Sequence, residues 1–141
     1  MYNKILLAAD GSQTSLNAAE AASKLVKNGF AKEVVVLHVA PSIVNSYYDL
    51  SPEVFEYATK KSKEASQEIL DKTKGLFPEE AKVETLLRFG ETAETICEVA
   101  KDGFDLVIMG SRGMNPLSGL MLGSVSTRVI HYSPCPVLIV K

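Results

Sequence analysis

Residues 106–113 read Leu106-Val107-Ile108-Met109-Gly110-Ser111-Arg112-Gly113, an apolar run that ends in two closely spaced glycines. Four consecutive apolar residues are typical of a parallel strand that is buried on both faces. After nine further residues, Gly123-Ser124 opens a segment up to Tyr132 whose composition allows a helix. The sequence therefore predicts a strand, a glycine loop, a short insertion and a helix start in succession.

This succession indicates an anion-binding site. Glycines let backbone amides approach a ligand where a Cβ would collide, and a helix N-terminus adds unpaired N–H groups with partial positive charge. Hydroxyl groups come from Ser124 and Ser126, and the guanidinium of Arg112 can donate two hydrogen bonds to a phosphate. The candidate residues here are Met109, Gly110, Arg112, Gly113, Gly123, Ser124, Val125 and Ser126. Together they favour a polyphosphate ligand.

The rest of the chain alternates apolar, strand-like runs with amphipathic segments. We expect strands at residues 4–9, 34–39, 82–89, 105–109 and 137–140, and helices at 12–27, 51–75, 91–102 and 125–132. Residues 40–50 have no clear period and are expected to form a loop. Five strands alternating with four helices predict a single α/β domain over residues 1–141, a doubly wound, parallel five-stranded sheet in the order 3-2-1-4-5.

In this order the first and fourth strands are neighbours, and the strand order reverses between them. Ligands of such sheets bind at this reversal, outside the carboxyl ends of the strands. Asp10 and Gly110 mark these two ends, so the topology and the glycine loop predict the same crevice. Asp10 could accept a hydrogen bond from a ribose hydroxyl, help hold Mg²⁺ against phosphates, or simply shape the turn before the first helix.

The spacing Gly-x2-Gly-x9-Gly-Ser, which starts at Gly110, resembles the signature of the ATP-binding universal stress proteins. It is neither the Walker pattern nor the dinucleotide fingerprint. Three further segments resemble the same family: Ile5-Leu6-Leu7-Ala8-Ala9-Asp10-Gly11-Ser12, Leu37-His38-Val39 and Pro134-Cys135-Pro136-Val137-Leu138-Ile139-Val140. The resemblance implies an ATP ligand with Mg²⁺ bound through the phosphates. It also implies adenine against the backbone of Val39 and a small residue, Ala8, close to the ligand.

Composition limits the classes of partner. A net charge of −2 over 141 residues argues against nucleic acid as the main partner, because binding to phosphate backbones needs a basic face. No apolar run approaches the ~20 residues that span a bilayer, and the first strand starts too early to leave room for a signal peptide. Cys97 and Cys135 lack the spacing of metal or redox motifs. We therefore expect a cytoplasmic protein without nucleic-acid or membrane partners.

The last predicted strand, Val137–Val140, suggests how two copies associate. Between Gly103 and Val140 the only charged residues are Asp105, Arg112 and Arg128. The terminal strand would lie at an edge of the sheet, where a short apolar strand invites pairing. The sequence predicts a homodimer joined through this strand, which the family resemblance also implies.

Three functions remain open at this point. The first is an ATP-binding regulatory or stress-response protein with slow hydrolysis at most, because no base for an attacking water and no loop lysine is evident. The second is a nucleotide hydrolase or adenylate-transferring enzyme, for which Asp10 is the candidate base. The third is a dimeric interaction module without nucleotide. His38 and His131 lack the oriented partners of a catalytic base, so both are interpreted as structural.

Overall fold

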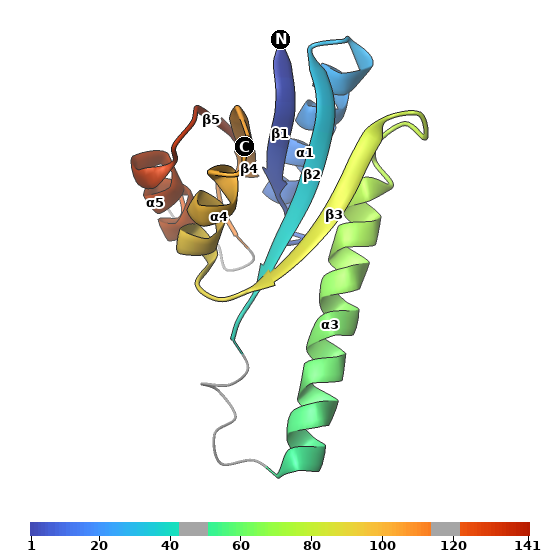
Figure 1. Ribbon diagram of the computed structural model, residues 1–141, viewed down its shortest axis with the longest axis vertical. Helices are drawn as coiled ribbons and strands as arrows, with labels where there is room; N and C mark the ends of the chain where they lie inside the picture. Colours follow the sequence, from blue (N-terminus) through green and yellow to red (C-terminus); the bar gives the residue numbers. More distant parts are fainter. Residues whose placement is uncertain (43–50, 114–121) are drawn as a thin grey trace.

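The structure is a computed structural model that describes residues 1–42, 51–113 and 122–141. Its strands are β1 (Tyr2–Ala8), β2 (Ala31–Ala40), β3 (Lys82–Phe89), β4 (Leu106–Gly110) and β5 (Val137–Val140). Its helices are α1 (Gln13–Lys27), α3 (Pro52–Lys74), α4 (Thr92–Ala100) and α5 (Ser124–Tyr132) (Figure 1). The loop expected at 43–50 and the insertion at 114–121 lie outside the described residues. Within the described ranges no helix is long and apolar enough to cross a membrane.

The five strands form one parallel sheet in the order β3-β2-β1-β4-β5. The predicted fold class and strand order are confirmed. The order reverses between β1 and β4, which pair from Ile5–Leu106 to Leu7–Ile108. Because both strands run in the same direction, their carboxyl ends meet at the same end of the sheet, towards the bottom of Figure 1.

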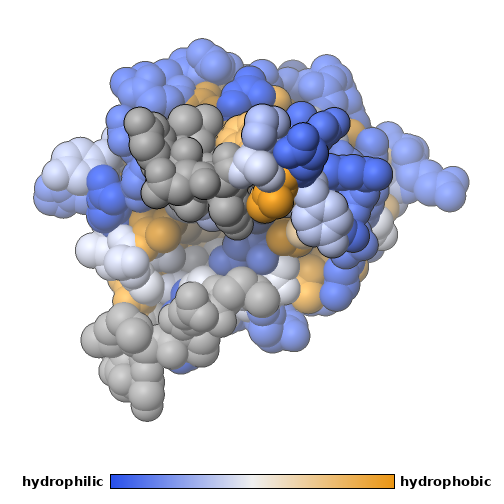
Figure 2. Space-filling view, turned by 90° about the horizontal axis from the view of Figure 1, so that it is seen from below, coloured by the Kyte–Doolittle hydropathy of each residue, from blue (hydrophilic) through white to orange (hydrophobic). Residues whose placement is uncertain are grey.

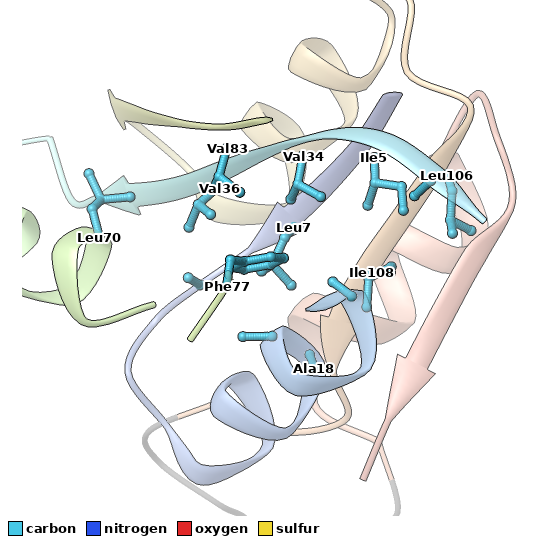
Figure 3. Packing of buried hydrophobic residues seen from close by; sticks show 14 residues of the cluster. Ile5, Leu7, Ala18, Val34, Val36, Leu70, Phe77, Val83, Leu106 and Ile108 are labelled. Atoms are coloured by element: carbon cyan, nitrogen blue, oxygen red, sulfur yellow. The ribbon is translucent and has the colours of Figure 1, made fainter. Parts of the chain in front are cut away.

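Helices cover both faces of the sheet, because successive residues of each strand point to opposite sides. One face packs against α1 and α3, where Leu7, Val36 and Ile108 meet Ala18 and Leu70 (Figure 3). The other face packs against α4 and α5, through a cluster that includes Leu6, Leu37, Val107, Met109, Ile96 and Val129. The sheet is thus the middle of three layers.

The helix starts differ in how their first N–H groups are bonded. Ser12 accepts a hydrogen bond from the Ser15 N–H at the start of α1, and Ser51 accepts one from Val54 at the start of α3. The Glu91 carboxylate accepts bonds from two N–H groups at the start of α4. Helix α5 follows Gly123 and has no side-chain cap.

Candidate functional site

A cavity of about 320 Å³ opens at the carboxyl ends of β1, β2 and β4, a size typical of small-molecule sites. Figure 2 views the molecule from this end, and hydrophobic residues come to the surface near the middle of the view. All the residues that the sequence singled out line this one cavity: Ala8, Asp10, Val39, Met109, Gly110, Arg112, Gly113, Gly123, Ser124, Val125 and Ser126. The topology therefore brings together segments from both halves of the chain.

Further lining residues were not anticipated from the sequence. They are Ala9, Ser15, Leu37, His38, Thr92, Ile96 and Leu122. Thr92 and Ile96 belong to α4, whose sequence reads as an ordinary amphipathic helix with no ligand-binding pattern. His38 belongs to the strand segment that carries the family resemblance, but its side chain was interpreted as structural.

The start of α5 presents backbone donors to the cavity. The first N–H groups of a helix have no partner within the helix, and Gly123 has no side chain that could bond to them. The Gly123 N–H itself donates to the Ser111 carbonyl at 2.7 Å, which fixes the helix start against the end of β4. With the positive end of the helix dipole, these open N–H groups create a setting suited to an anion.

The loop after β4 is held against the start of α1. A Cβ at Gly110 would lie 2.7 Å from the backbone carbonyl carbon of Thr14 and 2.8 Å from the backbone nitrogen of Ser15, so only glycine permits this approach. Thr14 Oγ1 donates to the Arg112 carbonyl at 2.7 Å. The loop backbone is thereby fixed, while the side chain of Arg112 remains exposed at the cavity.

Asp10 acts in the turn and also faces the cavity. Its Oδ1 accepts the Ser12 N–H at 2.9 Å, and its own N–H donates to Ser15 Oγ at 3.1 Å. These bonds form the turn before α1. Its Oδ2 is directed towards Gly113, where an added Cβ would lie 3.3 Å from it. One carboxylate oxygen is thus committed to the fold, and the other borders the cavity.

The two serines of α5 differ in what their hydroxyl groups can do. Ser126 is buried, and its Oγ donates to the Gly110 carbonyl at 2.8 Å. Since a hydroxyl has a single proton, this Ser126 group can act towards a ligand only as an acceptor. Ser124 is exposed at the helix start, so its hydroxyl is the one suited to donate to a phosphate oxygen.

The end of β2 leaves backbone groups facing the cavity. The Leu37 carbonyl accepts the Ala9 N–H at 2.8 Å, so the backbone groups of Leu37 point towards β1. In a parallel ladder every second residue bonds to the same neighbour, so the N–H and C=O of Val39 point the same way. Because β1 has already ended at Ala8, these Val39 groups face the crevice between β2 and the turn.

The two cysteines lie outside the cavity lining and fit structural roles. Burial raises the pKa of the Cys97 thiol, which packs in the α4–α5 cluster as a protonated side chain. Cys135 packs against the same cluster. In the part of the chain that the structure describes, no group of three or more His, Cys, Asp or Glu side chains could hold a metal ion.

The comparisons with known proteins agree with the fold. The model of the universal stress protein family matches residues 1–141. The universal stress protein YxiE of Bacillus subtilis is 39% identical over 149 residues, which cover all of both chains. The universal stress protein MJ0531 of Methanocaldococcus jannaschii is 38% identical over 144 residues, which cover all of this chain and 83% of the relative.

A solved structure supports the same family assignment by its fold. The structure of MJ0577, from the same archaeon, matches all of this chain and 96% of its own chain, at 33% identity and a TM-score of 0.76. The family inferred from the glycine spacing and the strand segments is thus confirmed by sequence and by structure. This chain belongs to the universal stress protein family.

Proposed function

We propose that this protein binds ATP with Mg²⁺ in the cavity and acts as a regulatory protein of the cytoplasmic stress response. The observation that carries the proposal is the uncapped start of α5 next to the glycine loop. Open N–H groups there need acceptors, and phosphate oxygens are strong acceptors with the matching charge. The phosphates would lie against Gly113, Gly123 and Ser124, with the guanidinium of Arg112 beside them.

The other groups of the cavity suit the remaining parts of a nucleotide. Asp10 Oδ2 is available to accept a hydrogen bond from a ribose hydroxyl or to contact Mg²⁺ that arrives bound to the phosphates. The N–H and C=O of Val39 offer one donor and one acceptor, and adenine presents an acceptor nitrogen beside its amino donor. Apolar side chains of Ile96 and Met109 line the same space and favour a flat, uncharged ring.

Universal stress proteins with bound nucleotides share this fold. One was solved in complex with cAMP, at 24% identity and a TM-score of 0.68. Another, from Arabidopsis thaliana, was solved with AMP bound, at 23% identity and a TM-score of 0.64. At these identities the likeness extends to the fold alone. The choice of ATP for this chain therefore rests on the resemblance of its glycine spacing to the ATP-binding members of the family, together with its own cavity residues.

Regulation fits the cavity better than catalysis. Efficient phosphoryl transfer needs several groups positioned together around the phosphates. Oδ1 of Asp10 is committed to the turn, and the Nδ1 of His38 is hydrogen-bonded to the Ala9 carbonyl. We expect slow hydrolysis at most. An Asp10→Ala variant that binds ATP normally but loses a robust turnover would favour a hydrolase instead.

The test begins with mass spectrometry of nucleotide released from freshly purified protein. We expect ATP in the wild type, and calorimetry with ATP and Mg²⁺ should then give binding to the emptied protein. Gly113→Val should abolish binding because its side chain enters the cavity beside Asp10, and Ser124→Ala should weaken it. Ser62→Ala, in α3 and outside the cavity, is the matched control. No released nucleotide and no heat of binding would leave the nucleotide-free interaction module as the better hypothesis.

We also propose a homodimer formed through β5. This strand lies at an edge of the sheet and pairs with β4 on one side. Leu138 on this edge strand and Ile130 on α5 are exposed apolar side chains in the same part of the chain, and a second copy would cover such an edge. Solution scattering should give the mass of a dimer. A monodisperse monomer at high concentration would contradict this part of the proposal.

A further inference from the structure

His38 changes the hydrogen-bond ladder between β1 and β2 at the border of the cavity. The last regular bond runs from the Ala9 N–H to the Leu37 carbonyl, at 2.8 Å. In a regular parallel ladder the next bond would run from the Val39 N–H to the Ala9 carbonyl. Among the described residues that bond is not formed. Instead, the Ala9 carbonyl lies 2.7 Å from Nδ1 of His38.

The direction of this bond follows from its two groups. A carbonyl oxygen can only accept, so Nδ1 of His38 carries the proton and donates. Leu37 and Val39 belong to the cluster beneath α4 and α5, so the alternation of the strand places His38 on the α1 side of the sheet. The ring reaches the Ala9 carbonyl from that side. With the Ala9 carbonyl bonded to the ring, the Val39 N–H has no bond to that carbonyl among the described residues and points towards the cavity.

We propose that His38 is a positioning residue for recognition of the nucleobase. By drawing the Ala9 carbonyl out of the ladder, its ring leaves the Val39 N–H free to donate to an acceptor nitrogen of a purine. The inference rests on the proposed binding of a nucleotide and adds a residue that selects its base. The same bond holds the backbone at Ala9, just before the turn that the bonds of Asp10 form.

The size of the effect follows from a single hydrogen bond. Without the His38 donor, we expect the Val39 N–H to bond to the Ala9 carbonyl and complete the regular ladder. A ligand base would then have to break that bond or do without it. One hydrogen bond of ordinary net strength corresponds to about threefold to tenfold in affinity. Loss of the His38 donor should weaken binding of the base and leave binding of the phosphates unchanged.

The binding test uses His38→Leu and His38→Asn. Leucine fills a similar space without a donor, whereas the asparagine amide nitrogen is separated from Cα by the same number of bonds as Nδ1 of histidine. We expect His38→Leu to bind ATP about threefold to tenfold more weakly and to bind inorganic tripolyphosphate as the wild type does. His38→Asn should stay within about twofold of the wild type for both. His131→Leu, an exposed histidine of α5, is the matched control.

A second measurement detects the hydrogen bond between the Val39 N–H and the Ala9 carbonyl in the absence of ligand. Hydrogen exchange of the Val39 amide, followed by NMR in nucleotide-free protein, should be slower in His38→Leu than in the wild type, because the bond to Ala9 forms. The inference is overturned if the exchange is unchanged, if tripolyphosphate binding falls as much as ATP binding, or if His38→Asn behaves like His38→Leu. Failure of the wild type to bind ATP would overturn the proposed function and with it the base-selecting role. The Val39 exchange would then separately decide whether His38 diverts the ladder.

Discussion

Helices α1 and α5 both begin at the carboxyl end of the sheet, after two neighbouring strands. Their first turns differ in how the N–H groups are bonded. At α1, the hydroxyl of Ser12 accepts the Ser15 N–H, so one N–H of the first turn is bonded to its own cap. At α5, the residues that the structure describes provide no side-chain acceptor for the corresponding N–H. The capped start stabilises the fold, whereas the open start provides the donors for a ligand.

The other two described helices support this distinction. α3 begins at the hydroxyl of Ser51 and α4 at the carboxylate of Glu91, each accepting from N–H groups of the first turn. Glycine at this position costs only a few tenths of a kcal/mol relative to the good capping residues. The chain therefore keeps donors free at α5 with little loss of stability.

A carboxylate placed at the start of α5 should cap the helix and repel an anionic ligand. In Gly123→Asp the new Cβ would be 3.5 Å from the Arg112 Cα, an ordinary contact, and φ is −74°, so the backbone accepts the change. Aspartate caps helices well, so stability should stay equal or rise slightly. Its charge would repel the phosphates, by up to about 4 kcal/mol for charges 4 Å apart near a protein surface.

We therefore expect ATP affinity to fall by about a hundredfold or more in Gly123→Asp, measured by calorimetry, while the midpoint of urea unfolding is kept. Gly123→Ala is the control, because it adds a Cβ without a charge or a cap. Unchanged ATP binding in the aspartate variant would show that phosphates do not lie at this helix start.

The close contact between the end of β4 and the start of α1 should be sensitive to any added volume. In Gly110→Ala the added Cβ would press on the backbone of Thr14 and Ser15, and overpacking of this kind costs about 1–3 kcal/mol. Gly113→Ala is the matched control, because its Cβ meets only Oδ2 of Asp10, at 3.3 Å. Urea unfolding should show a clear loss for the first variant and a smaller one for the second. Equal stabilities would mean that β4 and α1 can separate freely.

Much of this arrangement could be predicted from sequence because it depends on local patterns. Strand ends, glycine spacing and the helix starts near residues 12 and 51 each depend on only a few neighbouring positions. The order of the strands follows from their alternation with helices, and it puts Asp10 beside the glycine loop. The role of the Val39 backbone was implied by the family resemblance and by no local pattern, and the structure places that residue in the cavity.

The parts that were missed depend on contacts between distant segments. The His38 ring bonds to a backbone carbonyl 29 positions away, and a carbonyl has no signature in a sequence. Ile96 lines the cavity because α4 packs over the ends of β2 and β4, which its own amphipathic pattern cannot reveal. The proton of Ser126 goes to the carbonyl of Gly110, whereas the sequence shows only two similar serines in one helix.

Removing the cap from α1 should lower stability and keep ATP affinity, whereas adding a cap at α5 should keep stability and lower ATP affinity. In Ser12→Ala the Ser15 N–H loses its acceptor, and loss of a serine cap costs about 1 kcal/mol. For a domain of this size that is a fall of about 3 °C in Tm, measured by calorimetry. ATP affinity should stay within about twofold, because Asp10 is held through the backbone N–H of residue 12, which alanine retains. If Ser12→Ala kept normal stability but bound ATP weakly, the proposed contrast between the two helices would be wrong. The start of α1 would then take part in ligand binding, as the start of α5 is proposed to do.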